Sequence, residues 1–221
     1  MKVILFGATG MLGQGVLREA LSAPDVDRVL TVGRTPTGHR DKKLTDLVHQ
    51  NFGDFSSAER QLTGFDACFF CLGVSSAGMK EADYRHLTYD FALAAARTLV
   101  RLNPRMTFVY VSGTGTDSSA RGRVMWARVK GETENAILAL PFRAAYMFRP
   151  AFVQPMHGET SRVSWYRGIY AATGWLYPVL RRFFPRYVTT TEEIGRAMLR
   201  VAREGDSKRV IENQDITALG T

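Results

Sequence analysis

The fold of this 221-residue chain is decided by the stretch Val3-Ile4-Leu5-Phe6-Gly7-Ala8-Thr9-Gly10-Met11-Leu12-Gly13. An apolar run typical of a buried strand leads into a Gly-x-x-Gly-x-x-Gly pattern and then into a segment with helical periodicity. In such a turn Gly7 permits the tight bend, Gly10 lets the backbone approach a pyrophosphate, and Gly13 allows the helix to pack closely on the strand. The stretch therefore predicts a nucleotide-binding turn in which backbone N–H groups and the positive end of the helix face phosphates.

Strand and helix patterns alternate over the first two-thirds of the chain. Apolar runs bounded by turn signals occur at residues 3–6, 29–32, 67–72, 107–111 and 144–148, and helical periodicity occurs at 11–21, 84–102 and 126–140. This alternation predicts an α/β protein, namely a doubly wound parallel sheet (Rossmann fold) of about six or seven strands. We expect one domain over residues 1–221, within which residues 151–221 form a short C-terminal substrate or lid region.

The net charge of the chain indicates an anionic partner. Lys and Arg number 29 and Asp and Glu 21, which gives +8 at pH 7, so a nucleotide, a nucleic acid or an anionic lipid must be considered. A hydrophobic content of 45% with 23% charged residues is that of a globular chain and excludes a disordered or fibrous one. Only two cysteines are present, and the glycine pattern leaves no room for a signal peptide, so we expect a cytoplasmic protein.

Arg34 follows the second expected strand, about twenty residues beyond the last glycine of the pattern. Proteins specific for NAD place Asp or Glu there, to accept a hydrogen bond from the ribose 2′-OH. Arginine suits a 2′-phosphate instead, through charge-assisted hydrogen bonds. The sequence therefore predicts NADP rather than NAD as the cofactor.

Two further features lie close to this expected site. Arg40, Lys42 and Lys43 either add to the same positive field or form a solvated basic loop. Asp54 and Phe55 follow the third strand of such a fold, for which no apolar run gives bounds here. They lie near the adenine if the fold is the usual one or form an exposed turn if it is not.

The sequence Cys68-Phe69-Phe70-Cys71 spells C-x-x-C, but it lies within an expected strand. Residues three apart in a strand point to opposite faces, so the two thiols cannot pair or share a metal ion without breaking the sheet. The chain also has no second Cys pair and no clustered His, Asp and Glu, so we expect no metal site.

Five motifs along the chain resemble those of the atypical short-chain dehydrogenase/reductases, a group of NAD(P)-binding Rossmann proteins that includes NAD-dependent epimerase/dehydratase-like members. The similarity is greatest to the Tat-interacting oxidoreductase-like branch, and it covers nearly the whole chain. The motifs are Gly7-Ala8-Thr9-Gly10-Met11-Leu12-Gly13, Phe70-Cys71-Leu72-Gly73, residues 84–95, Val129-Lys130-Gly131-Glu132 and Phe148-Arg149-Pro150.

The resemblance implies an NADP(H)-binding, oxidoreductase-like or epimerase-like protein that acts on an unknown small substrate. It implies that the pyrophosphate is held by Gly7, Thr9, Gly10, Met11 and Leu12, with the 2′-phosphate on Arg34. It further implies that the cofactor's ribose is lined by Cys71, Leu72 and Gly73. At the nicotinamide end it implies a hydrogen bond from Lys130 to the ribose and a carboxamide beside Pro150, Phe152 and Val153.

The chemical centre of this family is Tyr-x-x-x-Lys, in which the lysine lowers the pKa of the tyrosine and the phenol exchanges a proton with the substrate. This chain has Trp126 and Lys130 at those positions. Indole N–H does not titrate near neutral pH, so Trp126 cannot act as the acid or base. The supporting hydroxyl is either Ser112 or Thr114, which lie fourteen and twelve residues before Trp126.

Two functions remain open from the sequence. The first is an NADP-dependent oxidoreductase in which Lys130 orients the cofactor, Ser112 or Thr114 polarises the substrate oxygen, and water or Tyr89 supplies the proton. The second is a catalytically silent NADPH-binding sensor or scaffold, which needs affinity for the cofactor but no acid and so does not need the missing tyrosine.

The stretch 165–186 combines Trp, Tyr and Phe with several arginines, including Arg181, Arg182 and Arg186. We expect it to pack as a lid over the cofactor, or to form a homodimer or protein-partner face. Contact with a membrane surface is less favoured, because Gly174 and Pro178 interrupt any amphipathic helix. No helix-turn-helix, RNP or zinc-finger pattern occurs, so no specific nucleic-acid partner is expected.

Overall fold

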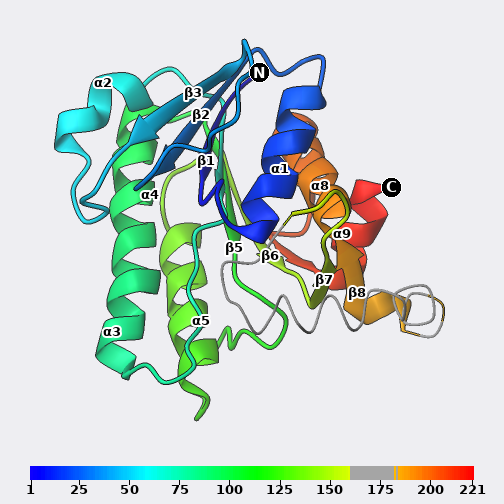
Figure 1. Ribbon diagram of the computed structural model, residues 1–221. Helices are drawn as coiled ribbons and strands as arrows, with labels where there is room; N and C mark the ends of the chain where they lie inside the picture. The colour runs from blue at the N-terminus through cyan, green and yellow to red at the C-terminus, as the bar shows by residue number, and fades with distance from the viewer. Residues whose placement is uncertain (160–181, 183) are drawn as a thin grey trace.

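A seven-stranded parallel sheet runs through the middle of the molecule (Figure 1). The computed structural model describes residues 1–159, 182 and 184–221. The strand order is β3-β2-β1-β4-β5-β6-β9. The strands of this sheet are β1 (Lys2–Phe6), β2 (Arg28–Gly33), β3 (Leu44–Val48), β4 (Ala67–Phe70), β5 (Thr107–Val111), β6 (Ala144–Arg149) and β9 (Val210–Glu212).

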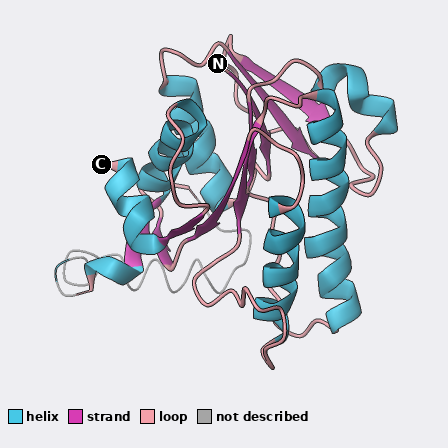
Figure 2. Ribbon diagram, turned by 180° about the vertical axis from the view of Figure 1, so that it is seen from behind, coloured by secondary structure: helices cyan, strands magenta, loops and turns pink. Residues whose placement is uncertain are grey.

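Helices cover both faces of the sheet, as Figure 2 shows from behind. One face carries α1 (Met11–Ser22), α8 (Thr191–Arg203) and α9 (Asn213–Gly220). The other face carries α2 (Glu59–Leu62), α4 (Phe91–Leu102) and α5 (Met125–Leu138). Shorter elements are the 3₁₀ turns η1 (Ser56–Ala58) and η4 (Pro185–Tyr187), the helix α3 (Glu81–Arg85) and the π-helical turn η2 (His86–Asp90).

Alternation along the strands divides the core into two layers. In β1, Val3 and Leu5 pack toward α1 and α8, and Ile4 and Phe6 pack toward α2 and α4. All four side chains are fully buried, as expected of a parallel sheet covered on both faces. The doubly wound α/β prediction is therefore confirmed.

Two expected boundaries differ from the structure. The fourth expected strand, residues 67–72, ends at Phe70, because the chain turns there to pass over the glycine loop that follows β1. The expected helix 84–102 is three pieces, α3, η2 and α4. The wider π turn suits the Arg85–Asp90 ion pair, whose partners lie five residues apart rather than four.

The C-terminal part of the chain supplies an edge strand of the main sheet and two of the helices that cover one of its faces. Strand β8 (Val188–Thr190) pairs with β7 (Phe152–Gln154), α8 packs along α1, and β9 joins the main sheet beside β6. Helix α8 begins with a capping box, in which Glu193 N donates to Thr190 Oγ1 and Thr190 N donates to Glu193 Oε2, each at 3.0 Å.

The aromatic stretch lies mostly outside the described residues, which include only 182 and 184–186 of it. In that part Arg182, Phe184 and Arg186 are exposed. The lid and partner roles expected for this stretch stay predictions. Within residues 1–159, 182 and 184–221, no helix has both the length and the apolar character needed to cross a bilayer.

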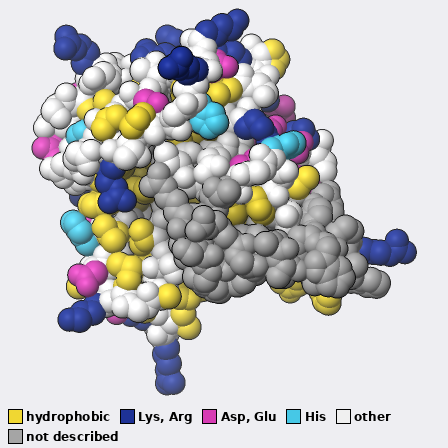
Figure 3. Space-filling view, in the orientation of Figure 1, with side chains coloured by type: hydrophobic (Ala, Val, Ile, Leu, Met, Phe, Trp, Pro, Cys, Tyr) yellow, Lys and Arg dark blue, Asp and Glu magenta, His cyan; other side chains and the backbone are white. Residues whose placement is uncertain are grey.

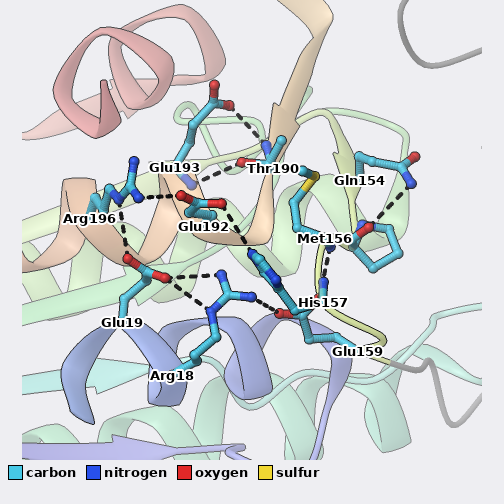
Figure 4. A network of polar contacts seen from close by, with 11 residues as sticks. Arg18, Glu19, Gln154, Met156, His157, Glu159, Thr190, Glu192, Glu193 and Arg196 are labelled. Atoms are coloured by element: carbon cyan, nitrogen blue, oxygen red, sulfur yellow. Dashed lines mark hydrogen bonds and ion pairs between the residues drawn. The ribbon is translucent and has the colours of Figure 1, made fainter. Parts of the chain in front are cut away.

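An ionic clamp ties the segment after β7 to α1 and α8 (Figure 4). The Glu159 side chain is buried, and its Oε2 accepts hydrogen bonds from the main-chain N–H groups of Met156 and His157, both at 2.8 Å. Its Oε1 accepts from Arg18 of α1 at 3.0 Å. The exposed His157 ring lies 3.3 Å from Glu192 of α8. These contacts hold the segment that follows β7 against α1, the helix that follows the glycine loop.

Candidate functional site

A cavity of about 310 Å³ opens at the carboxyl edge of the sheet. The chain moves outward from β1 to β2 and β3 and then crosses back to β4, so the topology changes direction between β1 and β4. In doubly wound sheets, ligands bind in the crevice at this switch point. The cavity is lined by Gly7, Ala8, Thr9, Gly10, Thr31, Val32, Gly33, Arg34, Thr35, Thr37, Phe52, Cys71, Leu72, Gly73 and Val74.

The geometry of the glycine loop explains two of its glycines. Gly7 has φ +79°, and a Cβ there would lie 2.8 Å from the backbone of Cys71. A Cβ on Gly13 would lie 2.1 Å from the carbonyl oxygen of Gly7, so the first turn of α1 can approach β1 only without a side chain. A Cβ on Gly10, which lines the cavity, would lie 3.4 Å from the carbonyl oxygen of Gly7, an ordinary van der Waals distance. Gly7 and Gly13 therefore shape the loop, and Gly10 leaves the space above it open.

Helix α1 begins at Met11 directly beside this cavity. Its N-cap residue is Gly10, and no side chain caps it. The backbone N–H groups of a first helical turn have no partner within the helix, and they are attractive to phosphates. This arrangement fits the diphosphate of a dinucleotide. Of the residues predicted for it, Gly7, Thr9 and Gly10 line the cavity, and Met11 and Leu12 form the first turn behind them.

Arg34 lies in the wall of the cavity at the end of β2, with an exposed side chain. Gln50 fixes the local backbone by donating to the Arg34 carbonyl oxygen at 2.9 Å. Among the residues that the structure describes, no carboxylate forms an ion pair with the Arg34 guanidinium. The group is therefore available to an anion in the cavity.

The basic loop behind Arg34 divides into two parts. Lys43 Nζ donates to the carbonyl oxygens of Leu21 and Ala23 at 2.9 and 2.8 Å, so it closes the C-terminal end of α1. Arg40 and Lys42 are exposed and line an open depression beside the cavity. Figure 3 shows Lys and Arg side chains scattered over the face of the molecule in that view, both inside its outline and at its rim.

Asp54 and Phe55 are not in the cavity wall. Asp54 accepts hydrogen bonds from the backbone N–H and the hydroxyl of Ser56, which hold the pKa of its carboxyl below the usual value. Phe55 is buried, with its ring centroid 5.8 Å from that of Phe6. Phe52 from the same loop lines the cavity instead. The exposed turn is thus the better description of Asp54.

The two cysteines face different layers, as the strand alternation predicts. Cys68 is buried in the layer under α2 and α4, and Cys71 packs against the layer under α1 and α8. Both are free thiols. Burial raises the pKa of each thiol, so neither is a ready nucleophile. Cys71, Leu72 and Gly73 all line the cavity, where the resemblance puts them.

A second group of polar side chains is buried where β5 ends, beneath α5. Lys130 Nζ donates to the main-chain carbonyl oxygen of Ser112. Ser112 Oγ donates to Glu134 Oε1 at 2.5 Å and to the carbonyl oxygen of Phe148 at 3.2 Å. Arg149 holds the same carboxylate, with Nε 3.0 Å from Oε1 and Nη2 2.5 Å from Oε2. The structure therefore brings Lys130 and Ser112 together over a buried ion pair.

Burial lowers the pKa of Lys130 to about 8, although the Glu134 carboxylate acts in the opposite direction. Burial is the larger effect because it removes water from the charged ammonium and so disfavours the protonated form. The opposing effect of Glu134 is small because Arg149 already balances its charge. The Lys130 amine thus changes protonation close to physiological pH, as a group that exchanges protons must.

The other predicted residues of the chemical centre lie around this pair. Thr114 Oγ1 donates to the carbonyl oxygen of Arg149 at 3.0 Å. Trp126 begins the turn of α5 that precedes Lys130, and a Cβ on Gly115 would lie 3.4 Å from the Cη2 atom of its ring. The indole therefore covers the loop after β5.

Tyr89 lies elsewhere, in the π-helical turn η2. Its ring carries the Arg85 guanidinium 4.0 Å from the centroid, and it lines a separate cavity of about 400 Å³ together with Asp54 and Phe55. At the expected nicotinamide end, Pro150 and Val153 are buried and Phe152 is half-buried in β7.

The sequence reasoning missed the partnership of Glu134 and Arg149. A signal was present, because Glu134 follows Lys130 by four residues and so shares its helix face. Arg149 ends a strand that is otherwise apolar, and a buried guanidinium requires a carboxylate. Phe52, Thr35 and Thr37 had no such signal, since loop residues carry no periodicity.

Solved structures with a similar fold are epimerases and short-chain dehydrogenases, while no family model matches the sequence. WbmF from Bordetella bronchiseptica, in complex with NAD⁺, is 12% identical with a TM-score of 0.68 and covers 98% of this chain and 76% of its own. UDP-glucose 4-epimerase from Thermotoga maritima, with UDP-glucose, is 16% identical with a TM-score of 0.65 and covers 99% and 81%. At these identities the likeness defines the class of fold, a Rossmann-like α/β fold of the epimerase and short-chain dehydrogenase type.

Curated relatives are similar in sequence along much of the chain. Protein fmp52, mitochondrial, of Emericella nidulans is 29% identical over 165 residues, which are 72% of this chain and 69% of the relative. Protein FMP52, mitochondrial, of Debaryomyces hansenii is 26% identical over 211 residues, which are 92% and 88%. The expected nearness to the Tat-interacting branch stays a prediction.

These relatives contradict the cytoplasmic location expected from the sequence, because they are named as mitochondrial proteins. That expectation was wrong in its reasoning as well. A small number of cysteines argues against a disulfide-bonded fold, but it does not distinguish one intracellular compartment from another.

Proposed function

We propose that this protein binds NADP(H) in the cavity at the carboxyl edge of the sheet and uses it as an oxidoreductase on a small carbonyl substrate. The observation that carries the proposal is the cavity itself, which has the glycine loop and the uncapped start of α1 on one side and the unpaired Arg34 guanidinium on another. The WbmF structure, which is similar in fold, holds NAD⁺.

The residues present fit such a cofactor along its length. The 2′-phosphate would lie at Arg34, with the adenosine toward Phe52, and the diphosphate would lie over Gly7 and Gly10. The nicotinamide half would then extend along the same sheet edge toward β5, where Lys130 lies. A bound NADPH would supply a hydride, and the chain would have to position the substrate oxygen and give it a proton.

A second candidate, an NADPH-binding sensor without chemistry, is favoured by one observation. The position that precedes Lys130 by one helical turn holds Trp126, which cannot donate a proton at neutral pH. In addition, the Ser112 hydroxyl donates to Glu134 and to Phe148, so it is already engaged. A protein of this kind needs affinity for NADPH but no acid.

The cofactor assignment is tested by replacing Arg34 with Asp and measuring NADPH and NADH binding by calorimetry. Loss of a charge-assisted hydrogen bond to the 2′-phosphate weakens NADPH binding about 10-fold to 100-fold and leaves NADH within about threefold. Arg60→Asp, a change at another arginine outside the cavity wall, is the control. Equal weakening of both cofactors by Arg34→Asp would refute the 2′-phosphate role.

Turnover separates the two candidate functions. We expect measurable oxidation of NADPH with a panel of aldehydes, quinones and flavins, because the Lys130 centre lies at the same sheet edge as the cavity. Binding of NADPH with no oxidation by any member of the panel favours the sensor.

A further inference from the structure

The position that should hold the proton donor of this site is filled by Trp126, while the lysine one turn further along α5 is present and half-buried. We propose that the Lys130 ammonium is itself the acid that gives a proton to the substrate oxygen. This inference rests on the proposed NADPH-dependent reduction and names the group that completes it.

The place of the Lys130 amine in the fold suits this role. Its Nζ donates to the carbonyl oxygen of Ser112, the residue that directly follows β5. The carboxyl ends of β1, β4 and β5 lie side by side in the sheet, so the amine lies at the edge that carries the cavity. An ammonium has three donor hydrogens, and one of them satisfies the Ser112 carbonyl. The contact fixes the nitrogen and leaves protons for a substrate.

Among the residues that the structure describes, no carboxylate forms an ion pair with the Lys130 ammonium. On its own helix, both Glu134 oxygens are taken by Arg149 of β6, and one also accepts the Ser112 hydroxyl. Glu132 of the same helix lies 3.4 Å from Arg85 of α3.

Two buried tyrosines, Tyr84 of α3 and Tyr110 of β5, also lie beside α5, and Arg128 of α5 pairs with Glu81 of α3 at 2.7 Å. Burial raises the pKa of both phenols, so they stay neutral at physiological pH. Lys130 is therefore desolvated without being paired, and this combination favours release of its proton.

The competing donors of the site are already engaged or distant. The Ser112 and Thr114 hydroxyls donate to Glu134 and to the Arg149 carbonyl oxygen. Tyr89 lines a different cavity. Among the residues that the structure describes at this end of β5, Lys130 is the group that changes protonation near physiological pH.

The proton balance of the step is simple. The hydride supplied by NADPH adds to the carbonyl carbon, and Lys130 Nζ loses one proton to the carbonyl oxygen. The substrate carbonyl becomes an alcohol, NADPH becomes NADP⁺, and the neutral amine regains its proton from water. In the reverse direction the neutral amine accepts the hydroxyl proton.

The first test measures the amine without any turnover. Lysines are labelled by reductive methylation with ¹³C-formaldehyde, and their NMR signals are followed from about pH 6 to about pH 11, with the Lys130 signal assigned by its loss in Lys130→Arg. We expect the signal of Lys130 to titrate near pH 8 and that of Lys208, whose pKa is raised by its hydrogen bond to Asp215, to titrate above the ordinary range of lysine. If Lys130 titrates with the exposed lysines, the proposal is overturned.

The second test is the pH dependence of NADPH oxidation with 4-nitrobenzaldehyde and 9,10-phenanthrenequinone as probes. Wild type should reduce them at a rate that falls above about pH 8, as the ammonium is lost. Lys130→Arg keeps a positive donor but no releasable proton, so the rate should fall at least about 100-fold and the break near pH 8 should vanish. Lys208→Arg, remote from the site, should behave as wild type.

The outcomes distinguish this inference from the function on which it rests. Lys130→Arg should still bind NADPH within a few-fold of wild type, and circular dichroism of Lys130→Arg and Lys130→Met checks that both fold. A retained rate and pH break in a folded Lys130→Arg variant overturn the role of Lys130. Wild type that binds NADPH but reduces neither probe also overturns it and leaves cofactor binding intact. Failure to bind NADPH and NADH overturns both proposals.

Discussion

Glu134 of α5 and Arg149 of β6 form a two-bonded ion pair in the interior, with Nε–Oε1 at 3.0 Å and Nη2–Oε2 at 2.5 Å. The Glu134 side chain is 1% exposed and that of Arg149 is 10% exposed. The pair joins the helix that carries Lys130 to the strand that leads into Pro150. A second arginine contact, from Nη2 to Ser118 Oγ at 2.6 Å, ties in the loop after β5. One buried carboxylate therefore fixes three segments around the proposed chemical centre.

Replacement of Glu134 by Gln should destabilise the fold strongly. The amide keeps the shape of the side chain but removes the buried partner of Arg149 and leaves its guanidinium only the half-exposed Glu212, at 3.1 Å, which should cost about 3 kcal/mol. Glu204→Gln is the matched control, because it removes a carboxylate from the exposed Arg200–Glu204 pair of α8 and should cost about 0.5 kcal/mol or less. Urea unfolding of both variants measures the loss of unfolding free energy. Equal losses would show that the buried pair does not stabilise the fold more than the exposed pair does.

Two alanine substitutions in the glycine loop should separate folding from cofactor binding. In Gly13→Ala the new methyl group would lie 2.1 Å from the Gly7 carbonyl oxygen, so α1 must move and stability should fall by about 2 kcal/mol or more. In Gly10→Ala the nearest atom is 3.4 Å away, so stability should stay within about 1 kcal/mol of wild type. The Gly10 methyl group borders the cavity, however, and should weaken NADPH binding at least about tenfold.

Thermal unfolding and calorimetric titration with NADPH measure the two effects. A Gly10→Ala variant that binds NADPH as tightly as wild type would show that the diphosphate does not pass over this residue.

The predictable part of the protein is the part with periodicity. The glycine loop, the first two strands and the helix around Lys130 follow from apolar runs and their spacing, because each must bury one continuous face. Strand β3 had no assigned boundaries, because its residues 44–48 are not an uninterrupted apolar run and lie at the edge of the sheet. Strands β7, β8 and β9 have three residues each, which is too short for an alternation to be seen.

The candidate site shows the same division. Gly7, Gly10 and Arg34 were predictable, because each position carries a constraint that one residue type meets. Asp54 and Phe55 were candidates for the adenine end, but Phe52 of the same loop lines the cavity instead. In a loop the residue that turns inward is decided by tertiary packing, here by the aromatic contacts of Phe52 and Phe55 with Phe6. The partner of a buried charge such as Arg149 is likewise a property of the fold, and several carboxylates along the sequence were equally plausible.

Removal of the Glu159 side chain should loosen the segment that follows β7. In Glu159→Ala the N–H groups of Met156 and His157 lose their acceptor, and Arg18 loses one of its two carboxylates, so we expect a loss of about 2 kcal/mol. Glu192→Ala removes a more exposed carboxylate from the same clamp and should cost about 1 kcal/mol or less. Urea unfolding compares the two, and a larger loss for Glu192→Ala would contradict the anchoring role of Glu159.

The lowered pKa of Lys130 should also appear in the pH dependence of stability. The Lys130 pKa is about 8 in the folded protein and 10.5 in a model peptide, so between these values the unfolded chain binds a proton that the folded chain has lost. Rising pH therefore favours the folded state over this window, and wild type should gain up to about 3 kcal/mol relative to Lys130→Met between about pH 7 and about pH 10.5. Lys208 is the control of opposite sign, because the hydrogen bond that its ammonium donates to Asp215 raises its pKa. Its contribution to stability is therefore complete at lower pH and declines only above the pKa of the unfolded chain. Urea unfolding of wild type, Lys130→Met and Lys208→Met at each pH supplies the differences, in which the titration of all other groups cancels. A difference between wild type and Lys130→Met that stays constant across the window would mean that the Lys130 amine holds its proton as an exposed lysine does, and Lys130 would then not be the group that supplies the proton that Trp126 cannot.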